Sequence, residues 1–298
     1  MSIDLVSAGS GWLLFLAGVL LTGSVVARAL ISPGATAPDA AWLDRGTAGP
    51  GLVGAVLMPI ALSLLFVRQF REFRDPFAPW SEDVSLLLSS SWGTAFKVAA
   101  AGAVVALVAM TAARRGRSWG WWGAAVAAVV LAVFPGLTGH ASGGEVPTWL
   151  TLPSDALHVL AAGAWVGGLA SVLWLESAWR RRGALPSSLL PALVPRFSRV
   201  AQVAVATLIL TGVVATWFQL PALTDLWTTP YGRTLSLKLA VVAVVLALGG
   251  INWKRLSPRL DEADGPGAMR RAATLELVLG TLVLLITAVL VRTSPTGH

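Results

Sequence analysis

The sequence contains no cysteine, only three histidines and four methionines, and only 12% of its 298 residues are charged. The absence of cysteine excludes disulfide bonds and thiolate metal sites. The scarcity of charge excludes an ordinary soluble domain, in which roughly 25% of the residues are charged. Any transition metal must therefore be held by imidazole, thioether, carboxylate or backbone oxygen, and the candidate side chains are few.

Several motifs of catalysis and targeting are also missing. There is no Walker loop, Rossmann glycine fingerprint, H-E-x-x-H or G-x-S-x-G sequence, so an ATP-driven pump or a common hydrolase lacks its chemistry, and we do not expect an enzyme. The first ten residues carry an aspartate but no Lys or Arg, so they lack the basic start of a signal peptide. We expect the first apolar segment to stay in the mature protein.

The residues that are abundant indicate helices packed in lipid. Hydrophobic residues make up 55% of the chain, the mean hydropathy is +0.73, and there are 30 glycines and 14 tryptophans. We predict an all-α, polytopic membrane helix bundle, because apolar runs of about 20 residues cross a bilayer as helices. Eight such runs are expected, near residues 11–31, 50–67, 92–113, 118–138, 155–176, 199–219, 234–251 and 272–291.

The basic residues predict the orientation of these spans. The net charge is +7 and the pI about 11.1, but Lys and Arg occur in short clusters between apolar runs, which favours topology over nucleic-acid binding. Most of them fall in 28–49, 114–117, 177–199 and 252–271, which the positive-inside rule assigns to the cytoplasm. Both termini are then expected in the periplasm. The segment 68–91 argues against this orientation, because it carries Arg68, Arg71 and Arg74.

An internal similarity supports the same orientation. Residues 86–97 and 226–238 both read as a leucine-led stretch with small hydroxyl residues, then an aromatic residue near a glycine, then a helix start with an early lysine. They lie four spans apart, which is consistent with a 4+4 parallel repeat and places both segments on one side of the membrane. Chance similarity of two helix starts is the alternative. We predict two membrane halves, 1–138 and 139–298.

Histidine supplies the main candidate metal ligands. His140 follows the fourth span and His158 is expected one turn inside the fifth, so both fall near the predicted outer face. Asp155 precedes His158 by three residues and is placed to orient its ring, and Trp165 follows by seven on the same helical face. A capping role for Asp155 and a packing role for His158 are the structural alternatives. The third histidine, His298, is expected to be a terminal residue without function.

Weaker candidates lie elsewhere. Met58 and Met110 could offer thioether sulfur to Cu(I), although core filling is the more ordinary role of methionine. Glu276 in the last span is expected to pair with Arg270 or Arg271, with a part in an ion exit as the alternative. The glycines at 163, 167 and 168 are expected to let another helix approach closely.

The second half of the sequence resembles the copper resistance D (CopD) family. The similarity runs in order over about residues 140–291, and 1–138 matches full-length members more loosely. It is carried by Asp155-Ala-Leu-His158, Trp165-Val-Gly167-Gly168, Arg196-Phe-Ser-Arg199, Leu210-Thr211-Gly212, Thr229-Pro-Tyr-Gly-Arg-Thr-Leu-Ser-Leu-Lys238, Asn252 and Pro258-Arg259-Leu260.

The resemblance implies a bacterial inner-membrane protein that moves copper from the periplasm towards the cytoplasm, often beside a CopC-type periplasmic copper-binding partner. Its family histidines correspond to His140 and His158, which could hold Cu(I) or Cu(II). The alternatives are a b-type haem protein of electron transfer or haem-linked oxidation, with the same two histidines as axial ligands, and an assembly factor without metal. The scarcity of methionine argues against a thioether cluster for Cu(I).

Overall fold

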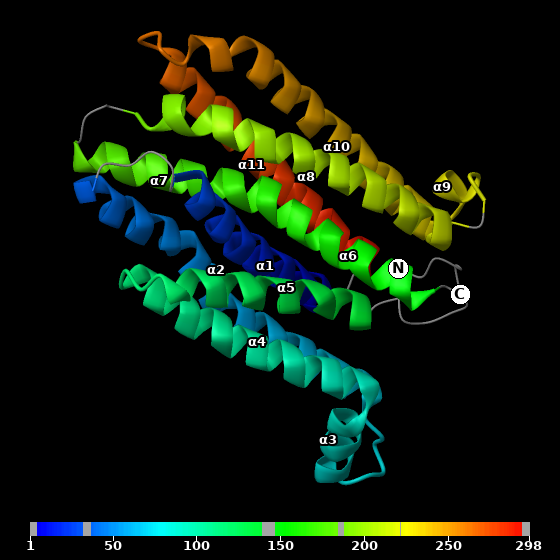
Figure 1. Ribbon diagram of the computed structural model, residues 1–298. Helices are drawn as coiled ribbons and strands as arrows, with labels where there is room; N and C mark the ends of the chain where they lie inside the picture. The colour runs from blue at the N-terminus through cyan, green and yellow to red at the C-terminus, as the bar shows by residue number, and fades with distance from the viewer. Residues whose placement is uncertain (1–4, 32–36, 139–146, 184–187, 221, 294–298) are drawn as a thin grey trace.

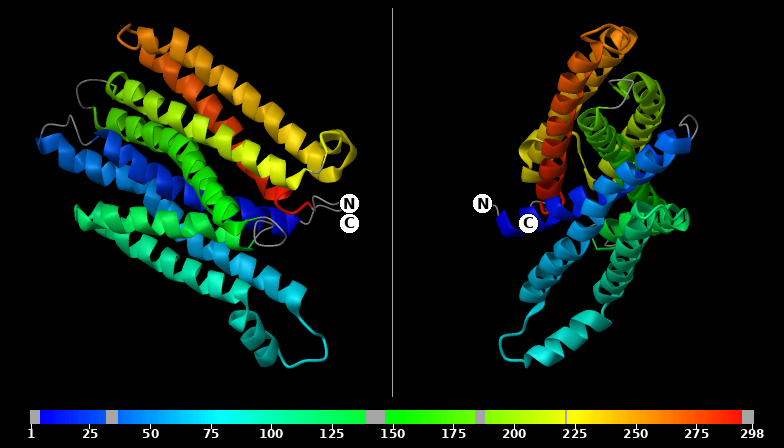
Figure 2. Two further views of the ribbon diagram at one scale, coloured as in Figure 1. Left: turned by 45° about the vertical axis from the view of Figure 1, so that its right-hand side comes forward. Right: turned by 90° about the vertical axis from the view of Figure 1, so that its left-hand side faces the viewer.

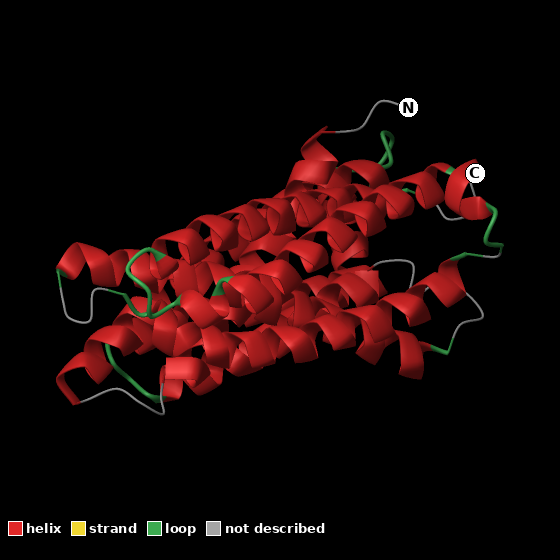
Figure 3. Ribbon diagram, turned by 90° about the horizontal axis from the view of Figure 1, so that it is seen from above, coloured by secondary structure: helices red, strands yellow, loops and turns green. Residues whose placement is uncertain are grey.

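The computed structural model describes residues 5–31, 37–138, 147–183, 188–220 and 222–293, and every regular element in these ranges is a helix (Figure 3). Eight helical segments are long and apolar enough to cross a membrane. The protein is thus an all-α polytopic bundle, as the sequence predicts. The helices are α1 (Leu5–Ile31), α2 (Ala37–Phe73), α3 (Trp80–Ser89), α4 (Ser91–Arg114), α5 (Trp119–Thr138), α6 (Thr148–Ala162), α7 (Gly168–Arg182), α8 (Leu190–Gln219), α9 (Asp225–Thr228), α10 (Pro230–Arg255) and α11 (Gly265–Leu290).

The long helices run side by side, with α4 and α10 at opposite edges of the bundle (Figures 1 and 2). The short helices α3 and α9 lie at one end with both chain termini, and we call this end the α9 end. The helices α1, α4, α7 and α10 finish at the other end. It carries the 3₁₀ turn η3 (Ser257–Arg259), and we call it the η3 end.

Exposed tryptophans mark both ends of the bundle. Four of them are at the α9 end and four at the η3 end, and each is at least 46% exposed. Tryptophan is enriched where a membrane meets water, because its ring is apolar and its N–H is polar. The two belts therefore match the two faces of a bilayer. They consist of Trp80, Trp149, Trp217 and Trp227 at the α9 end, and of Trp119, Trp122, Trp174 and Trp253 at the η3 end.

A π-helical turn, η2 (Gly163–Gly167), joins α6 to α7 and makes Thr148–Arg182 one continuous span. Its glycines allow α1 to approach at backbone distance. A Cβ on Gly167 would lie 2.7 Å from the Val19 carbonyl carbon, and a Cβ on Gly163 would lie 2.6 Å from the Thr22 Cβ. The predicted close approach at these glycines is confirmed, and the approaching helix is α1.

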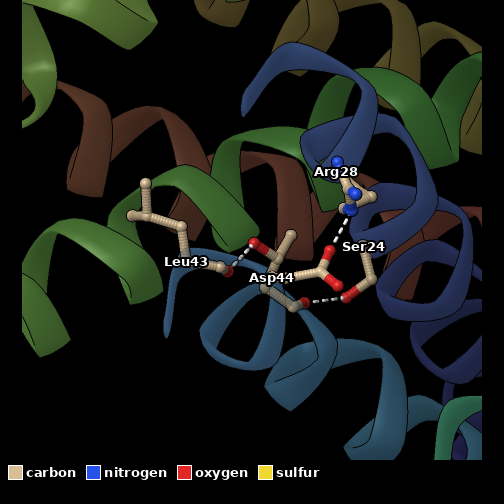
Figure 4. A network of polar contacts seen from close by, with 5 residues as sticks. Ser24, Arg28, Leu43 and Asp44 are labelled. Carbon is tan, nitrogen blue, oxygen red and sulfur yellow. Dashed lines mark hydrogen bonds and ion pairs between the residues drawn. The ribbon is translucent and has the colours of Figure 1, made fainter. Parts of the chain in front are cut away.

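A hydroxyl group of α1 is inserted into the backbone of α2 (Figure 4). The Gly51 N–H donates to Ser24 Oγ (2.6 Å), and the Ser24 hydroxyl donates to the Thr47 carbonyl (2.8 Å). These two backbone groups are four residues apart, so Ser24 bridges a step of the helical ladder next to Pro50. One turn further along α1, Arg28 forms an ion pair with Asp44. The α1–α2 pair is thus fixed by polar contacts as well as by packing.

Two helices begin earlier than their hydropathy indicates. The second span starts at Ala37 rather than near residue 50, and the fifth starts at Thr148 rather than near 155. Both early segments contain polar residues and a proline, Pro50 or Pro153, which lower helix propensity and mean hydropathy. The helices nevertheless continue, because membrane helices tolerate proline where neighbours satisfy the freed backbone groups.

The two similar sequence segments form the same local structure. In each, a short helix ends at a hydroxyl residue, which accepts a hydrogen bond from the glycine N–H three residues later. Ser90 accepts from Gly93 (3.1 Å) at the start of α4, and Thr229 accepts from Gly232 (3.0 Å) at the start of α10. Both segments lie at the α9 end. Arg68, one of the three arginines that argue against the predicted orientation, forms an ion pair with Glu72 (3.6 Å).

Candidate metal site

The ring of His158 in α6 is held by α8. His158 Nδ1 lies 2.8 Å from Thr211 Oγ1, and Gly212 leaves the ring edge in contact with the helix surface, since a Cβ there would be 3.9 Å from His158 Cε1. His158 is half-buried and Thr211 is buried. The imidazole therefore has a fixed orientation between two membrane-spanning helices.

The hydrogen bonds of Thr211 favour the tautomer of His158 that carries its proton on Nδ1. Thr211 Oγ1 lies 2.7 Å from the Thr207 carbonyl, to which its single proton is donated. The oxygen then accepts from His158, so Nδ1 bears the hydrogen of the neutral ring. Nε2 is left with its lone pair, which is the form of imidazole that binds a metal.

Helix α8 is itself anchored near its start. Glu176 Oε2 accepts a hydrogen bond from the Leu189 N–H (2.7 Å), where the carboxylate also faces the positive end of the helix dipole. Arg196 Nη1 donates to the Leu30 carbonyl (3.0 Å). Thr211 therefore projects from a helix whose position is fixed by α1 and α7.

His158 lies deeper than predicted. Because α6 starts at Thr148, ten residues separate the helix start from His158, a rise of about 15 Å rather than one turn. The exposed Trp149 is nine residues away on the same helix, so the ring is about 13 Å below the tryptophan belt. The expected interfacial histidine is thus a histidine within the membrane, in the half nearer the α9 end.

Asp155 does not hold the ring as predicted, since the structure gives no hydrogen bond or ion pair between these two residues. A Cβ on Gly136 would lie 3.5 Å from Asp155 Oδ2, so the carboxylate faces the end of α5. The partner of Nδ1 comes instead from another helix. Thr211 belongs to the Leu-Thr-Gly motif, but local sequence does not indicate its role, because the contact joins residues 53 positions apart.

Helix α10 also has residues near the depth of His158. Its Tyr231 donates a hydrogen bond to Gln219 of α8, which ties the two helices at the α9 end. Thr229 caps α10, and Lys238 follows about 13 Å further along, at a depth similar to that of His158. Lys238 is half-buried, whereas Lys97 near the start of α4 is exposed.

Trp165 and Glu276 lie together, away from His158. Both line a cavity of about 220 Å³ among η2, α7, α8, α10 and α11, and His158 is not among its lining residues. The predicted shared face of His158 and Trp165 is interrupted because Trp165 lies in the π turn, which has more than 3.6 residues per turn. Glu276 accepts a hydrogen bond from Asn252 and forms no ion pair with Arg270 or Arg271, so the predicted pairing is wrong.

Met58 and Met110 occupy the apolar core of α1, α2, α4 and α5, where both are at most 1% exposed. Their surroundings are those of core-filling methionines. His140 and His298 lie outside the described residues. Within the described part of the chain, no three side chains of the His, Asp and Glu types gather as a metal cluster. The stated role of His140 therefore stays a prediction.

These features define a polytopic membrane protein with a membrane-embedded imidazole in its second half. Residues 191–290, which include Thr211, Lys238, Asn252 and Glu276, match the family model described as Copper resistance protein D. This part of the chain, about a third of its length, is thus similar to the CopD family. Its resemblance to that family in sequence is thereby confirmed.

Three curated relatives are similar to the chain. The Bacillus subtilis protein named copper transport protein CutJ is 32% identical over 53% of this chain and 28% of its own length. The Escherichia coli inner membrane protein YebZ is 30% identical over 53% of this chain and 54% of its own length. The chain thus spans about a quarter to a half of these two relatives.

The third relative matches over a greater length. The Pseudomonas syringae pv. tomato copper resistance protein D is 26% identical over 80% of both chains. No solved structure matches the chain.

Proposed function

We propose that this protein takes copper from the periplasmic face of a bacterial inner membrane and moves it towards the cytoplasm, with His158 and His140 as the ligands of the first membrane site. Copper is the cargo. The observation that carries the proposal is the His158–Thr211 contact, which orients a neutral imidazole within the membrane and leaves Nε2 free.

The position of His140 in the chain supports its part in this site. It follows Thr138, the last residue of α5, by two positions. Helix α5 packs against α6 near this end, where the surroundings of Gly136 include Leu152 and Asp155. Asp155 is one turn from His158, so its carboxylate is placed to attract a cation between the two helices.

The direction rests on charge and depth. The loops at the η3 end carry most of the Lys and Arg residues, so the positive-inside rule places this end in the cytoplasm. His158 lies in the opposite half of the membrane and is thus reached first from the periplasm. A CopC-type periplasmic protein is the expected copper donor at the α9 end.

Metal analysis of the detergent-purified protein tests the proposal. The parent is expected to bind copper, and the double variant His140→Ala/His158→Ala is expected to lose it while keeping its helical circular dichroism and its elution volume. The variant His298→Ala is the matched control, because it removes the third histidine only, and it should bind like the parent. Undiminished copper binding by the folded double variant would overturn the proposal.

The same samples distinguish the other two functions. A Soret band that disappears in the double variant identifies the histidines as haem ligands and contradicts copper binding at them. Absence of both copper and haem from the folded parent, after incubation with each, identifies an assembly role. Copper accumulation by cells that express each variant then tests transport itself.

A further inference from the structure

The cavity of about 220 Å³ in the η3 half contains a carboxylate that the proposed copper site does not use. Its lining comes from η2, α7, α8, α10 and α11, and Glu276 is the single ionisable residue in it. The other polar side chains that face it are Ser198, Gln202 and Asn252. The residues from α7 that line it are apolar.

One oxygen of Glu276 is held and the other is accessible. The Asn252 side-chain amide donates to Oε1. Oε2 faces Gly249, where an added Cβ would lie 3.5 Å away, so the missing side chain leaves space beside this oxygen. Neither Lys254 and Arg255 on α10, Arg270 and Arg271 on α11, nor Arg196 and Arg199 on α8 forms an ion pair with it among the described residues.

We infer that Glu276 is a reversible proton-binding site that exchanges with water on the η3 side through this cavity. A carboxylate within a membrane span is costly without a partner charge, and such groups mark ion and proton pathways. A hard cation such as magnesium or calcium needs more ligands than the cavity offers. Magnesium and calcium take six or more oxygens, whereas Glu276 is joined here by only two amides and one hydroxyl.

Proton binding here is a simple transfer. A hydronium ion gives its proton to Oε2, one O–H bond of hydronium breaks, the Oε2–H bond forms, and neutral water leaves. The Asn252 amide continues to donate to Oε1 in both states. The charge of the cavity therefore changes by one without any change in its side-chain contacts.

The binding of this proton is independent of copper, but its coupling to copper movement rests on the proposed function. The chain has no nucleotide motif to supply energy. Glu276 lies on the proposed cytoplasmic side of His158. Helices α8 and α10 have residues at the depth of His158 and also line the cavity of Glu276, so a proton gradient that acts on Glu276 would act on helices that also surround the proposed copper site.

Infrared spectroscopy on copper-free protein in lipid tests proton binding directly. A pH titration of the parent is expected to show a protonated carboxyl C=O band that grows as the pH falls, and Glu276→Gln is expected to lose that band. Glutamine keeps the size of the side chain and still accepts from Asn252, so the variant should fold. An unchanged band in folded Glu276→Gln, or no titrating band in the parent, overturns the inference.

Two positions on α10 test the route to the carboxylate. Gly249→Val places methyl groups against Oε2 and is expected to slow hydrogen–deuterium exchange of the carboxyl proton at least several-fold. Ala247→Val is the matched control, because Ala247 is exposed on the same helix and does not line the cavity, and it should exchange like the parent. Equal exchange rates in both variants contradict access past Gly249.

Coupling is then measured in vesicles. Copper uptake by the parent should acidify or alkalise the lumen in proportion to the copper moved, and Glu276→Gln should abolish this pH change. Loss of copper binding by the histidine variants with the infrared band intact would leave the proton site standing alone. The failure of one proposal is thereby separated from the failure of the other.

Discussion

At the scale of single residues, replacement of Thr211 is expected to weaken copper binding, although Thr211 is not itself a proposed ligand. In the variant Thr211→Val the His158 ring loses its Nδ1 partner, so the two neutral tautomers compete and the ring can rotate. Loss of such a partner weakens metal binding roughly 10–100-fold. Thr211→Ser keeps the hydroxyl and is expected to bind copper like the parent. Isothermal titration of copper into each purified protein measures the difference, and equal affinities for valine and serine would argue against this role.

The same hydrogen bond predicts how copper binding responds to pH. With Nδ1–H donated to Thr211, the proton that charges the ring must bind at Nε2, the atom proposed to bind copper. Protonation therefore competes directly with the metal, and copper binding should weaken as the pH falls. Copper titrations of the parent and of His158→Ala over a range of acidic pH check this. A pH dependence of copper binding that is unchanged in folded His158→Ala would show that this imidazole is not a ligand.

Candidate residues differed in how far local sequence could identify them. His158 is a candidate because only three histidines are present, and Asp155 because of its three-residue spacing. The role of Thr211 is not predictable from the sequence, since threonine is common in membrane helices and its partner lies on another helix. The partner of Glu276 is hard to predict for a similar reason. Charge alone favoured nearby arginines, whereas the fold presents the Asn252 amide.

At the scale of the helices, the inserted hydroxyl of Ser24 predicts a stability effect. Ser24→Ala leaves the Gly51 N–H and the Thr47 carbonyl without their bridge in a membrane core, which costs about 1–3 kcal/mol. Ser63→Ala is the control, because that hydroxyl bonds only the Pro59 carbonyl of its own helix and is exposed to lipid. Reversible unfolding in mixed micelles measures both. A Ser24 variant as stable as the Ser63 variant contradicts the bridge.

The number and order of the spans were predictable, but their starts were not. Apolar runs of 20 residues identify every span, because lipid demands an internally bonded backbone. The first turns of α2 and α6 are polar and contain or precede proline, so hydropathy places their starts seven or more residues late. That error matters for function, since it placed His158 at the interface.

At the scale of the whole molecule, the topology can be tested with cysteine variants, since the natural chain contains none. Thr224→Cys at the α9 end is expected to react with a membrane-impermeant maleimide on intact cells. Ser118→Cys at the η3 end should react only after the membrane is opened. Both positions are exposed, so accessibility within the protein does not differ. The reverse labelling pattern would invert the proposed direction of copper movement.

The predicted halves, 1–138 and 139–298, stay a prediction, and the packing shows why a boundary is hard to place from sequence. One apolar core lies among α1, α2, α4 and α5. A second core joins α7, α8 and α11 to Leu30, Ile31 and Leu43 of the first half. Helix α1 thus contributes to both, and a long-range contact of this kind leaves no local signature.

The π turn between α6 and α7 sets how far the faces of these two helices are rotated relative to each other about their common axis. In α6, His158 faces α8, and in α7, Leu169 and Val172 face the cavity of Glu276. A π turn is equivalent to one extra residue in an α-helix, and each residue adds about 100° of rotation. Deleting one residue there, such as Ala164, would swing the imidazole away from Thr211 while leaving every side chain of both sites in the chain.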